Sequence, residues 1–320
     1  NETRRDNMII DLNKGWKVLQ DVHDTGEKLG LYREGFSGDM GNQISEWEEV
    51  PELKHLQLLL ARQPYFGREL RYFNQAPWWY KLEFELPEEG GTYAKLHFTN
   101  VDYYCKIWLN GEYVGEHEGY SMPFSFRVDD KIRSGETNTL IVKVWSPWDT
   151  EILDDRCDRR TFLVCRNSIK GTYEHSDTFV QRDVNPVGIY GEVTIELCGT
   201  ACFADVPEID YTLSDDLKDA CVRVKVNAVN VDHAIYTLRF VCRDWITGET
   251  LCETSERMED SGEYILQADA MDIRLWNTWD KGGPWLYNMV VELLRDNAVV
   301  AHHEELLGFR KIELFRDADT

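Results

Sequence analysis

The chain has 320 residues, of which 42% are hydrophobic, 11 are Trp and 8 are Cys, and its formal net charge at pH 7 is −23. This length exceeds that of one ordinary sandwich and predicts two domains with substantial hydrophobic cores. The acidic charge argues against binding to nucleic acid or to an anionic membrane surface, because both interactions need clustered Lys and Arg. A neutral or cationic partner is compatible with this charge, and so is a role in solubility alone.

The chain contains no run of about 18 apolar residues, and its first residues, NETRRDNMIIDL, lack the hydrophobic region of a signal peptide. We therefore expect no membrane insertion and a cytoplasmic location, although a leader removed before residue 1 would permit secretion. The cysteines lie mostly in apolar strand-like runs, without CxxC pairs or metal-ligand spacing, and are expected to be buried, reduced thiols. A disulfide between Cys157 and Cys165 is left open as an alternative.

The first half of the chain has the alternation of a β-sandwich. Residues 8–16 predict an edge strand, residues 24–43 an irregular loop, and residues 53–61 a short helix made of good helix formers. Six further strands are predicted from period-2 alternation: 79–86, 92–100, 103–109, 112–117, 125–128 and 139–146. Within this series Asn110-Gly111 predicts a type I′ hairpin turn, because both residues tolerate the positive φ angles that the turn needs. Seven aromatic residues in the segment 65–80 favour core packing over a sugar-stacking platform.

The segment 147–179 has no strand pattern and is rich in charged residues, and a loop of this length is usually functional or disordered. After it, residues 193–197 predict the last strand of the first domain, and the small residues of 199–207 predict a boundary. The second half again alternates and predicts these strands: 220–230, 236–243, 263–268, 286–295 and 299–309.

Two polar clusters have the residue types of catalytic or metal sites but not the arrangement. His302-His303-Glu304-Glu305 lies in a predicted strand, where neighbouring side chains point to opposite faces and cannot chelate one ion together. The adjacency of Ser, His and Asp within 173–177 argues against a catalytic triad, whose members come from separate segments. Nucleotide-binding glycine motifs do not occur. We predict no catalytic residue, no metal site and no cofactor in this chain.

Four segments, in order, resemble the N-terminal sugar-binding jelly roll of glycoside hydrolase family 2. They are WYKLEFELP, the hairpin IWLNGEYVGEHEGYSMPFSFRV, SGETNTLIVKVWSP and DVNPVGIYGEVTIE. In the second half, LWNTWDKGGPWLYNMVVEL and GFRKIE are similar to elements of that family's immunoglobulin-like domain. The resemblance implies an all-β protein, with a jelly-roll (galactose-binding-like) β-sandwich at residues 1–203 and an immunoglobulin-like β-sandwich at residues 204–320.

The family's catalytic (β/α)8 barrel follows the GFR sequence and needs roughly 250 residues. The resemblance therefore implies that this chain is the non-catalytic N-terminal part of a retaining β-glycosidase that hydrolyses terminal β-linked sugars. Its partners would be a carbohydrate substrate and the C-terminal barrel of the same polypeptide. The alternative is a stand-alone carbohydrate-binding or adhesion module without hydrolase activity, and a homo-oligomer is left open.

One local feature bears on the substrate. Arg182, Asp183 and Asn185 lie just before Gly188-Ile189-Tyr190. By the resemblance, Asp183 corresponds to the Asp that reaches from the jelly roll into the barrel's sugar pocket, where a carboxylate accepts strong hydrogen bonds from sugar hydroxyls. Arg182 and Asn185 replace a Trp and a Gly of β-mannosidases, which argues against mannose. The alternative is that Asp183 caps the turn before Pro186.

Overall fold

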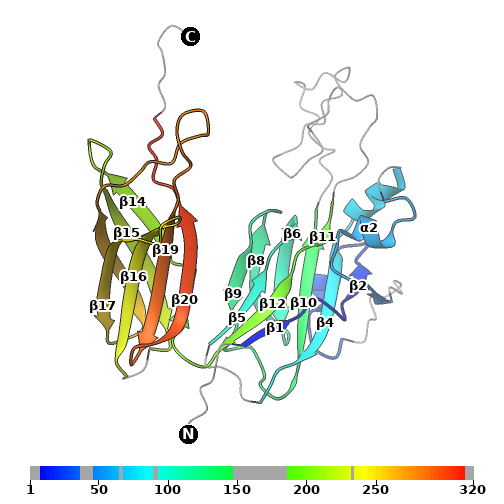
Figure 1. The fold of residues 1–320 in the computed structure, drawn as a ribbon. Helices are drawn as coiled ribbons and strands as arrows, with labels where there is room; N and C mark the ends of the chain where they lie inside the picture. Colours follow the sequence, from blue (N-terminus) through cyan, green and yellow to red (C-terminus); the bar gives the residue numbers. More distant parts are fainter. Residues whose placement is uncertain are drawn as a thin grey trace. The chain divides into compact units, whose positions relative to one another are not determined.

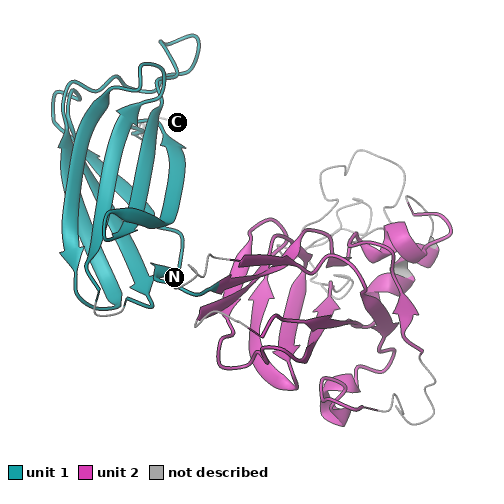
Figure 2. Ribbon diagram, turned by 60° about the horizontal axis from the view of Figure 1, so that its bottom comes forward, with its two compact units in different colours: residues 1–6, 198–320 teal, residues 7–197 magenta. Residues whose placement is uncertain are grey.

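The computed structural model describes residues 8–36, 46–64, 68–88, 93–146, 186–231 and 234–313. The chain forms two compact units, residues 7–197 and residues 198–320 together with 1–6 (Figure 2). Nearly all regular elements are strands, which confirms the all-β prediction (Figure 1).

The first unit contains two facing sheets. Its strands and helices are β1 (Met8–Asp11), β2 (Lys17–Gln20), α1 (Gly26–Leu29), β3 (Glu48–Glu49), α2 (Leu56–Leu60), the 3-10 helix η1 (Arg68–Asn74), β4 (Trp78–Glu85), β5 (Tyr93–Phe98), β6 (Val101–Asp102), β7 (Tyr104–Leu109), β8 (Glu112–Glu118), β9 (Phe124–Arg127), β10 (Thr137–Trp145), β11 (Gly188–Ile189) and β12 (Val193–Cys198). One sheet has the order β1-β12-β5-β9 and the other the order β3-β2-β4-β10-β7-β8, while β11 pairs with β6. This arrangement is the predicted jelly-roll sandwich.

The six-stranded sheet is apolar on both faces. In its central strand β10, successive side chains point to opposite faces, and those of both faces are apolar. Leu140, Val142 and Val144 point into the main core between the two sheets. Ile141 points the other way and joins a second cluster with Leu19, Leu31, Trp79 and Trp108. We call this second group the outer cluster. Because it lies on the face turned away from the sandwich core, another segment must cover it.

Residues 21–36, which follow β2, cover the outer cluster, and we call them the covering segment. A buried carboxylate holds this segment in place. Asp21 is fully buried, and its side chain accepts hydrogen bonds from the backbone N–H groups of Thr25 (3.0 Å) and Gly26 (2.6 Å) and from Trp79 Nε1 (3.2 Å). The region predicted as an irregular loop thus contains α1. The prediction was wrong there because a helix of four residues has no periodicity to detect, and tertiary contacts stabilise it instead.

Ion pairs attach the same segment to the outer face of the sheet. Lys143 Nζ lies 2.7 Å from Asp24 Oδ1, and Lys106 Nζ lies 3.0 Å from Glu27 Oε1. Partial burial raises the pKa of Glu27, but hydrogen bonds and charges from Lys106 and Lys143 outweigh it, so the pKa lies below its ordinary value. Lys143 is itself almost fully buried, so its side of the pair with Asp24 is shielded from water, whereas Asp24, Lys106 and Glu27 are partly exposed.

The central hairpin has the predicted turn. Asn110 and Gly111 adopt φ angles of 53° and 82°, as a type I′ turn requires. The Asn110 side chain also donates from Nδ2 to the carbonyl of Lys131 (2.8 Å) and to Asn138 Oδ1 (2.8 Å), and its Oδ1 accepts from the Thr139 N–H (2.8 Å). The residue that shapes the turn therefore also ties β7 and β8 to the start of β10.

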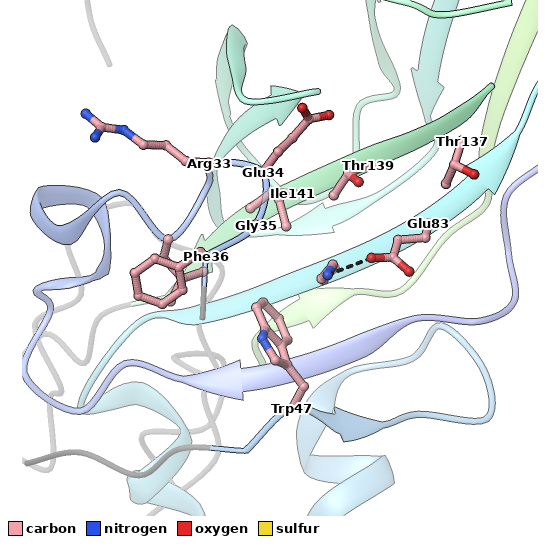
Figure 3. A pocket seen from close by; sticks show the side chains of 11 residues that line it. Arg33, Glu34, Gly35, Phe36, Trp47, Glu83, Thr137, Thr139 and Ile141 are labelled. Carbon is pink, nitrogen blue, oxygen red and sulfur yellow. Dashed lines mark ion pairs between the residues drawn. The ribbon is translucent and has the colours of Figure 1, made fainter. Parts of the chain in front are cut away.

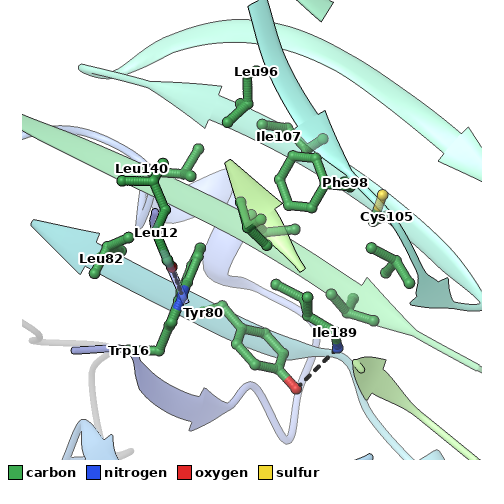
Figure 4. Close-up of a cluster of buried hydrophobic side chains, with 14 of the residues drawn as sticks. Leu12, Trp16, Tyr80, Leu82, Leu96, Phe98, Cys105, Ile107, Leu140 and Ile189 are labelled. Carbon is green, nitrogen blue, oxygen red and sulfur yellow. Dashed lines mark hydrogen bonds between the residues drawn. The ribbon is translucent and has the colours of Figure 1, made fainter. Parts of the chain in front are cut away.

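A tyrosine hydroxyl buried in the core closes one end of the sandwich. The Tyr80 hydroxyl accepts a hydrogen bond from the Ile189 N–H (3.3 Å), and desolvation raises the pKa of this phenol (Figure 4). Gly188, with φ +135°, lies so close that a Cβ atom there would be 2.6 Å from the same hydroxyl. Glycine is therefore required both by the backbone conformation and by the close approach.

The second unit is the predicted immunoglobulin-like sandwich. Its strands are β13 (Cys202–Phe203), β14 (Glu208–Leu213), β15 (Ala220–Val229), β16 (Tyr236–Asp244), β17 (Thr250–Met258), β18 (Gly262–Ala270), β19 (Tyr287–Arg295) and β20 (Ala298–Leu307). One sheet has the order β13-β15-β14 with β18 also on β15, and the other has the order β17-β16-β19-β20. The prediction missed β14, although its Ile209, Tyr211 and Leu213 alternate with polar residues, and it missed β17, whose residues are mostly exposed and supply little apolar alternation.

The division between the units falls between Leu197 and Cys198. It lies a few residues before the predicted boundary at residue 203, because β13 pairs with β15 and belongs to the second unit. Six described cysteines carry free thiols, and all of them except the half-buried Cys221 are buried. Burial raises the pKa of the Cys105 thiol to about 12. Cys157 and Cys165 lie outside the described residues.

We expect Gly188→Ala to destabilise the first unit by about 3 kcal/mol, because strain at positive φ adds to a clash with the Tyr80 hydroxyl. Gly119→Ala is the matched control, since Gly119 has φ +127° but its added Cβ would meet nothing nearer than 3.5 Å. Urea unfolding of both variants measures the difference. Equal losses of stability would show that the close approach contributes nothing.

Candidate functional site

The residues predicted to contact substrate, Arg182, Asp183 and Asn185, lie outside the described residues, as does the segment 173–177. The described chain stops at Ser146, just after β10, and resumes at Pro186, just before β11. The candidate site is therefore built from the residues that hold these two ends. Figure 1 shows α2, β6 and β11 at this end of the first unit.

Two amide side chains hold the two ends of the described chain. The Asn74 side chain, at the end of η1, donates a hydrogen bond to the carbonyl of Ser146 (2.7 Å). Gln57 Oε1, in α2, accepts one from the Val187 N–H (3.2 Å), and the Val187 carbonyl accepts one from the Leu56 N–H (2.9 Å). Asn74, Gln57 and Val187 are all buried. No local sequence pattern predicts these roles, because the partners of each pair are far apart along the chain.

A polar and aromatic group adjoins the second of these ends. His55 Nε2 lies 3.2 Å from Oδ2 of the fully buried Asp102, and the His55 ring stacks on Tyr190 with ring centroids 4.3 Å apart. The Tyr190 hydroxyl donates to the carbonyl of Tyr120, which also accepts a hydrogen bond from Asn100 Nδ2 (3.3 Å). We call these five residues the His55 cluster. Desolvation raises the pKa of Tyr190, and the negative charge of Asp102 adds to the shift.

The residues of the His55 cluster are suited to holding the backbone in place and not to hydrolysing a glycoside. It supplies one carboxylate, one imidazole and two phenols, whereas retaining glycoside hydrolysis needs two carboxyl groups about 5–5.5 Å apart. Its Asp102 is paired with Gly188 in the β6–β11 ladder. The cluster thus connects the backbone at Gly188 to the rest of the sandwich and orients the chain that leads into β11.

The described residues carry neither a metal-binding cluster nor a membrane-spanning helix. These residues contain no group of three or more His, Cys, Asp or Glu side chains that could hold a metal ion. In β20, His302 is opposite Glu292 and His303 is opposite Val291, so the two imidazoles alternate along the strand as predicted. Within the same described ranges, no helix is long and apolar enough to cross a membrane.

An open pocket of about 300 Å³ lies on the outer face of the six-stranded sheet (Figure 3). Phe36 and Trp47 border it, and Lys81, Glu83 and Thr139 are among the residues that line it from β4 and β10. We call it the outer pocket. No local stretch of sequence predicts this pocket, because its lining comes from segments separated by many residues.

Two family models match the chain in succession. Residues 38–175 match the glycosyl hydrolase 2 galactose-binding domain-like model, and residues 203–310 match the glycosyl hydrolases family 2 model. A β-galactosidase of Thermoanaerobacter pseudethanolicus is 23% identical over 274 residues, which are 84% of this chain and 32% of that enzyme. A β-glucuronidase of Formosa agariphila is 22% identical over 251 residues, which are 75% of this chain and 24% of that enzyme. The chain spans about a third of the length of such relatives, or less.

Solved structures show the same fold. A putative β-galactosidase from Bacteroides fragilis has a TM-score of 0.64 at 18% identity, with 97% of this chain and 42% of that one covered. A β-glucuronidase from Ruminococcus gnavus in complex with D-glucuronic acid has a TM-score of 0.61 at 21% identity, with 97% and 47% covered. At these identities the likeness establishes the fold alone.

We expect Gln57→Met to destabilise the first unit by about 1–3 kcal/mol, because it keeps the side-chain volume but leaves the buried Val187 N–H without its acceptor. Gln75→Met, at an exposed position, is the matched control and should change stability by less than about 0.5 kcal/mol. Urea unfolding and hydrogen exchange at the Val187 amide test the difference. Unchanged exchange in Gln57→Met would contradict the assigned role.

Proposed function

Because this chain belongs to glycoside hydrolase family 2, we propose that its two domains form the non-catalytic N-terminal part of a retaining β-glycosidase. In this proposal a C-terminal (β/α)8 barrel of the same polypeptide hydrolyses terminal β-linked sugars through two carboxylates outside these 320 residues. The two β-domains support that barrel and contribute to its substrate site. The named relatives include both β-galactosidases and β-glucuronidases, so the sugar itself is left open.

The observation that carries this proposal is the succession of the two family models along one chain that spans about a third of its relatives. A jelly roll followed by an immunoglobulin-like sandwich accounts for both matches. These matches favour the N-terminal part of an enzyme over a stand-alone carbohydrate-binding or adhesion module, because this chain matches only a part of much longer proteins. An encoding gene whose reading frame continues into an Asn-Glu motif would discriminate the two hypotheses in favour of the enzyme.

We further propose that Asp183 accepts hydrogen bonds from the substrate, with Arg182 and Asn185 beside it. Asp183 precedes Val187 by four residues, a length of chain that reaches at most about 14 Å when fully extended. Val187 is fixed by Gln57, next to the His55 cluster. The buried anchors at this end of the sandwich therefore support a role of this region in positioning a substrate-binding carboxylate.

The first test concerns activity. The 320-residue chain alone should hydrolyse no nitrophenyl β-galactoside, β-glucuronide or β-mannoside above background, since the proposed catalytic carboxylates lie elsewhere. Turnover by the pure chain that disappears when a single one of its carboxylates is replaced would refute the proposal.

The second test concerns Asp183. In the full-length enzyme, Asp183→Ala should lower kcat/KM by about ten- to 150-fold for each lost bond, because hydrogen bonds to charged groups contribute about 1.5–3 kcal/mol. Asp183→Asn keeps an acceptor oxygen without the charge and should have a smaller effect. Unfolding temperatures should change little. An Asp183→Ala enzyme with normal kcat/KM and an early thermal transition would instead support the turn-capping role.

A further inference from the structure

The geometry points to a carbohydrate-binding site in the outer pocket, and we infer that its ligand is a neutral pyranoside. This inference goes beyond the proposed function, because it assigns a ligand to residues of the six-stranded sheet and its covering segment. It rests on the shape of the pocket, on the aromatic rings at its border, on the balance of its charges and on the rigidity of its lining.

The floor of the outer pocket is a regular piece of sheet. In the register of β4 with β10, Glu83 is opposite Thr139 and Lys81 is opposite Ile141. These four side chains therefore stand on the same outward face, as the period of a strand requires. Lys81 Nζ and Glu83 Oε1 lie 2.7 Å apart, and both side chains are partly exposed, so they present one cation and one anion toward the opening.

Two aromatic rings form the walls. Phe36, in the covering segment, and Trp47, which precedes β3, lie on two sides of the floor (Figure 3). Both rings pack partly against the outer cluster and are half-buried. The face of an indole ring is electron-rich, and the axial C–H bonds on one face of a pyranose ring carry the opposite partial charge. The pocket thus offers both an apolar wall and a polar floor.

The lining is held in place without a ligand. Arg133 binds Glu34 through two hydrogen bonds of 2.6 and 3.1 Å, which fix the loop that carries Phe36. Leu31 and Ile141 are buried members of the outer cluster. On the other side, the Val50 N–H donates to the Trp16 carbonyl (3.0 Å) and anchors the chain just after β3. A preformed pocket binds with a smaller loss of conformational entropy than one that must assemble.

Size and charge select the class of ligand. A volume of about 300 Å³ is at the lower limit of small-molecule sites and suits about one or two sugar rings. The four charged lining residues are Arg33, Glu34, Lys81 and Glu83, which sum to zero. A charged ligand would meet charges of both signs and gain no net attraction from the lining, and a purely apolar ligand would desolvate the Lys81–Glu83 pair. A neutral ring with hydroxyl groups carries no net charge, and its hydroxyl groups can form hydrogen bonds with Lys81 and Glu83.

The test uses the 320-residue chain and four probes: the methyl β-D-glycosides of galactose, glucose, mannose and glucuronic acid. Each is titrated while the indole N–H resonances are followed by NMR, and the Trp47 signal is assigned by its absence in Trp47→Phe. We expect at least one neutral glycoside to shift the Trp47 signal saturably, with a Kd on the order of 1 mM. The charged glucuronide should bind more weakly than that glycoside.

Variants link the binding to the outer pocket. Trp47→Ala should weaken binding about tenfold or more, whereas Trp279→Ala, at a 90% exposed Trp of the second unit, should leave the Kd unchanged. Lys81→Met keeps the apolar stem of the side chain and removes its hydrogen-bond donors, so it should also weaken binding. Lys81→Met provides a second measurement of the effect on Kd if circular dichroism shows that Trp47→Ala is unfolded.

The inference is overturned if no neutral glycoside shifts the Trp47 signal at about ten times the expected Kd. It is also overturned if Lys81→Met and Trp279→Ala bind equally well, or if the glucuronide binds most tightly. These outcomes are independent of hydrolysis by the full-length enzyme. A negative titration result would not affect the Asp183 proposal, and an unchanged kcat/KM in Asp183→Ala would not affect the proposed site in the outer pocket.

Discussion

The constraint on which the first unit depends is that its six-stranded sheet is apolar on both faces. A sheet with one apolar face needs one partner, but β4 and β10 place large side chains on each side, with Tyr80 and Val142 inward and Trp79 and Ile141 outward. Burying the inward face against the second sheet forms the sandwich. Burying the outward face requires the segment that follows β2, and the buried Asp21 gives that segment its shape.

The outer pocket is a consequence of this double burial. Where the covering segment passes over the sheet, the outer cluster excludes water, and beside it Phe36 and Trp47 face the partly exposed strand residues Lys81 and Glu83. The same rings that protect the outer cluster are therefore also presented to solvent along one side. Phe36 and Trp47 can both stabilise the fold and contact a ligand, because an aromatic ring can pack against the outer cluster with one face and contact a ligand with the other.

The end of the sandwich near β11 follows a different principle, in which buried polar atoms specify the path of the backbone. Tyr80, Gln57 and Asn74 each place a hydrogen-bonding atom where main-chain groups of another segment need a partner. An unsatisfied buried group costs about 1–3 kcal/mol, so alternative paths of the chain at Gly188 and Val187 are disfavoured. This end of the first unit is suited to holding a substrate-contacting residue nearby, since the adjoining backbone has a single well-supported position.

The sequence by itself determined what depends on local pattern. Period-2 alternation predicted most strands of both units, and Asn110-Gly111 predicted the hairpin turn, because strand faces and positive φ angles are properties of adjacent residues. The motifs also led to the family, although the predicted site residues Arg182, Asp183 and Asn185 lie outside the described residues. Helix α1, the strand β17, the anchors Gln57 and Asn74, the His55 cluster and the outer pocket were decided only by the tertiary structure. Each of them depends on contacts between segments far apart in the chain, or on exposed residues without alternation, and neither kind of signal is present in a local stretch of sequence.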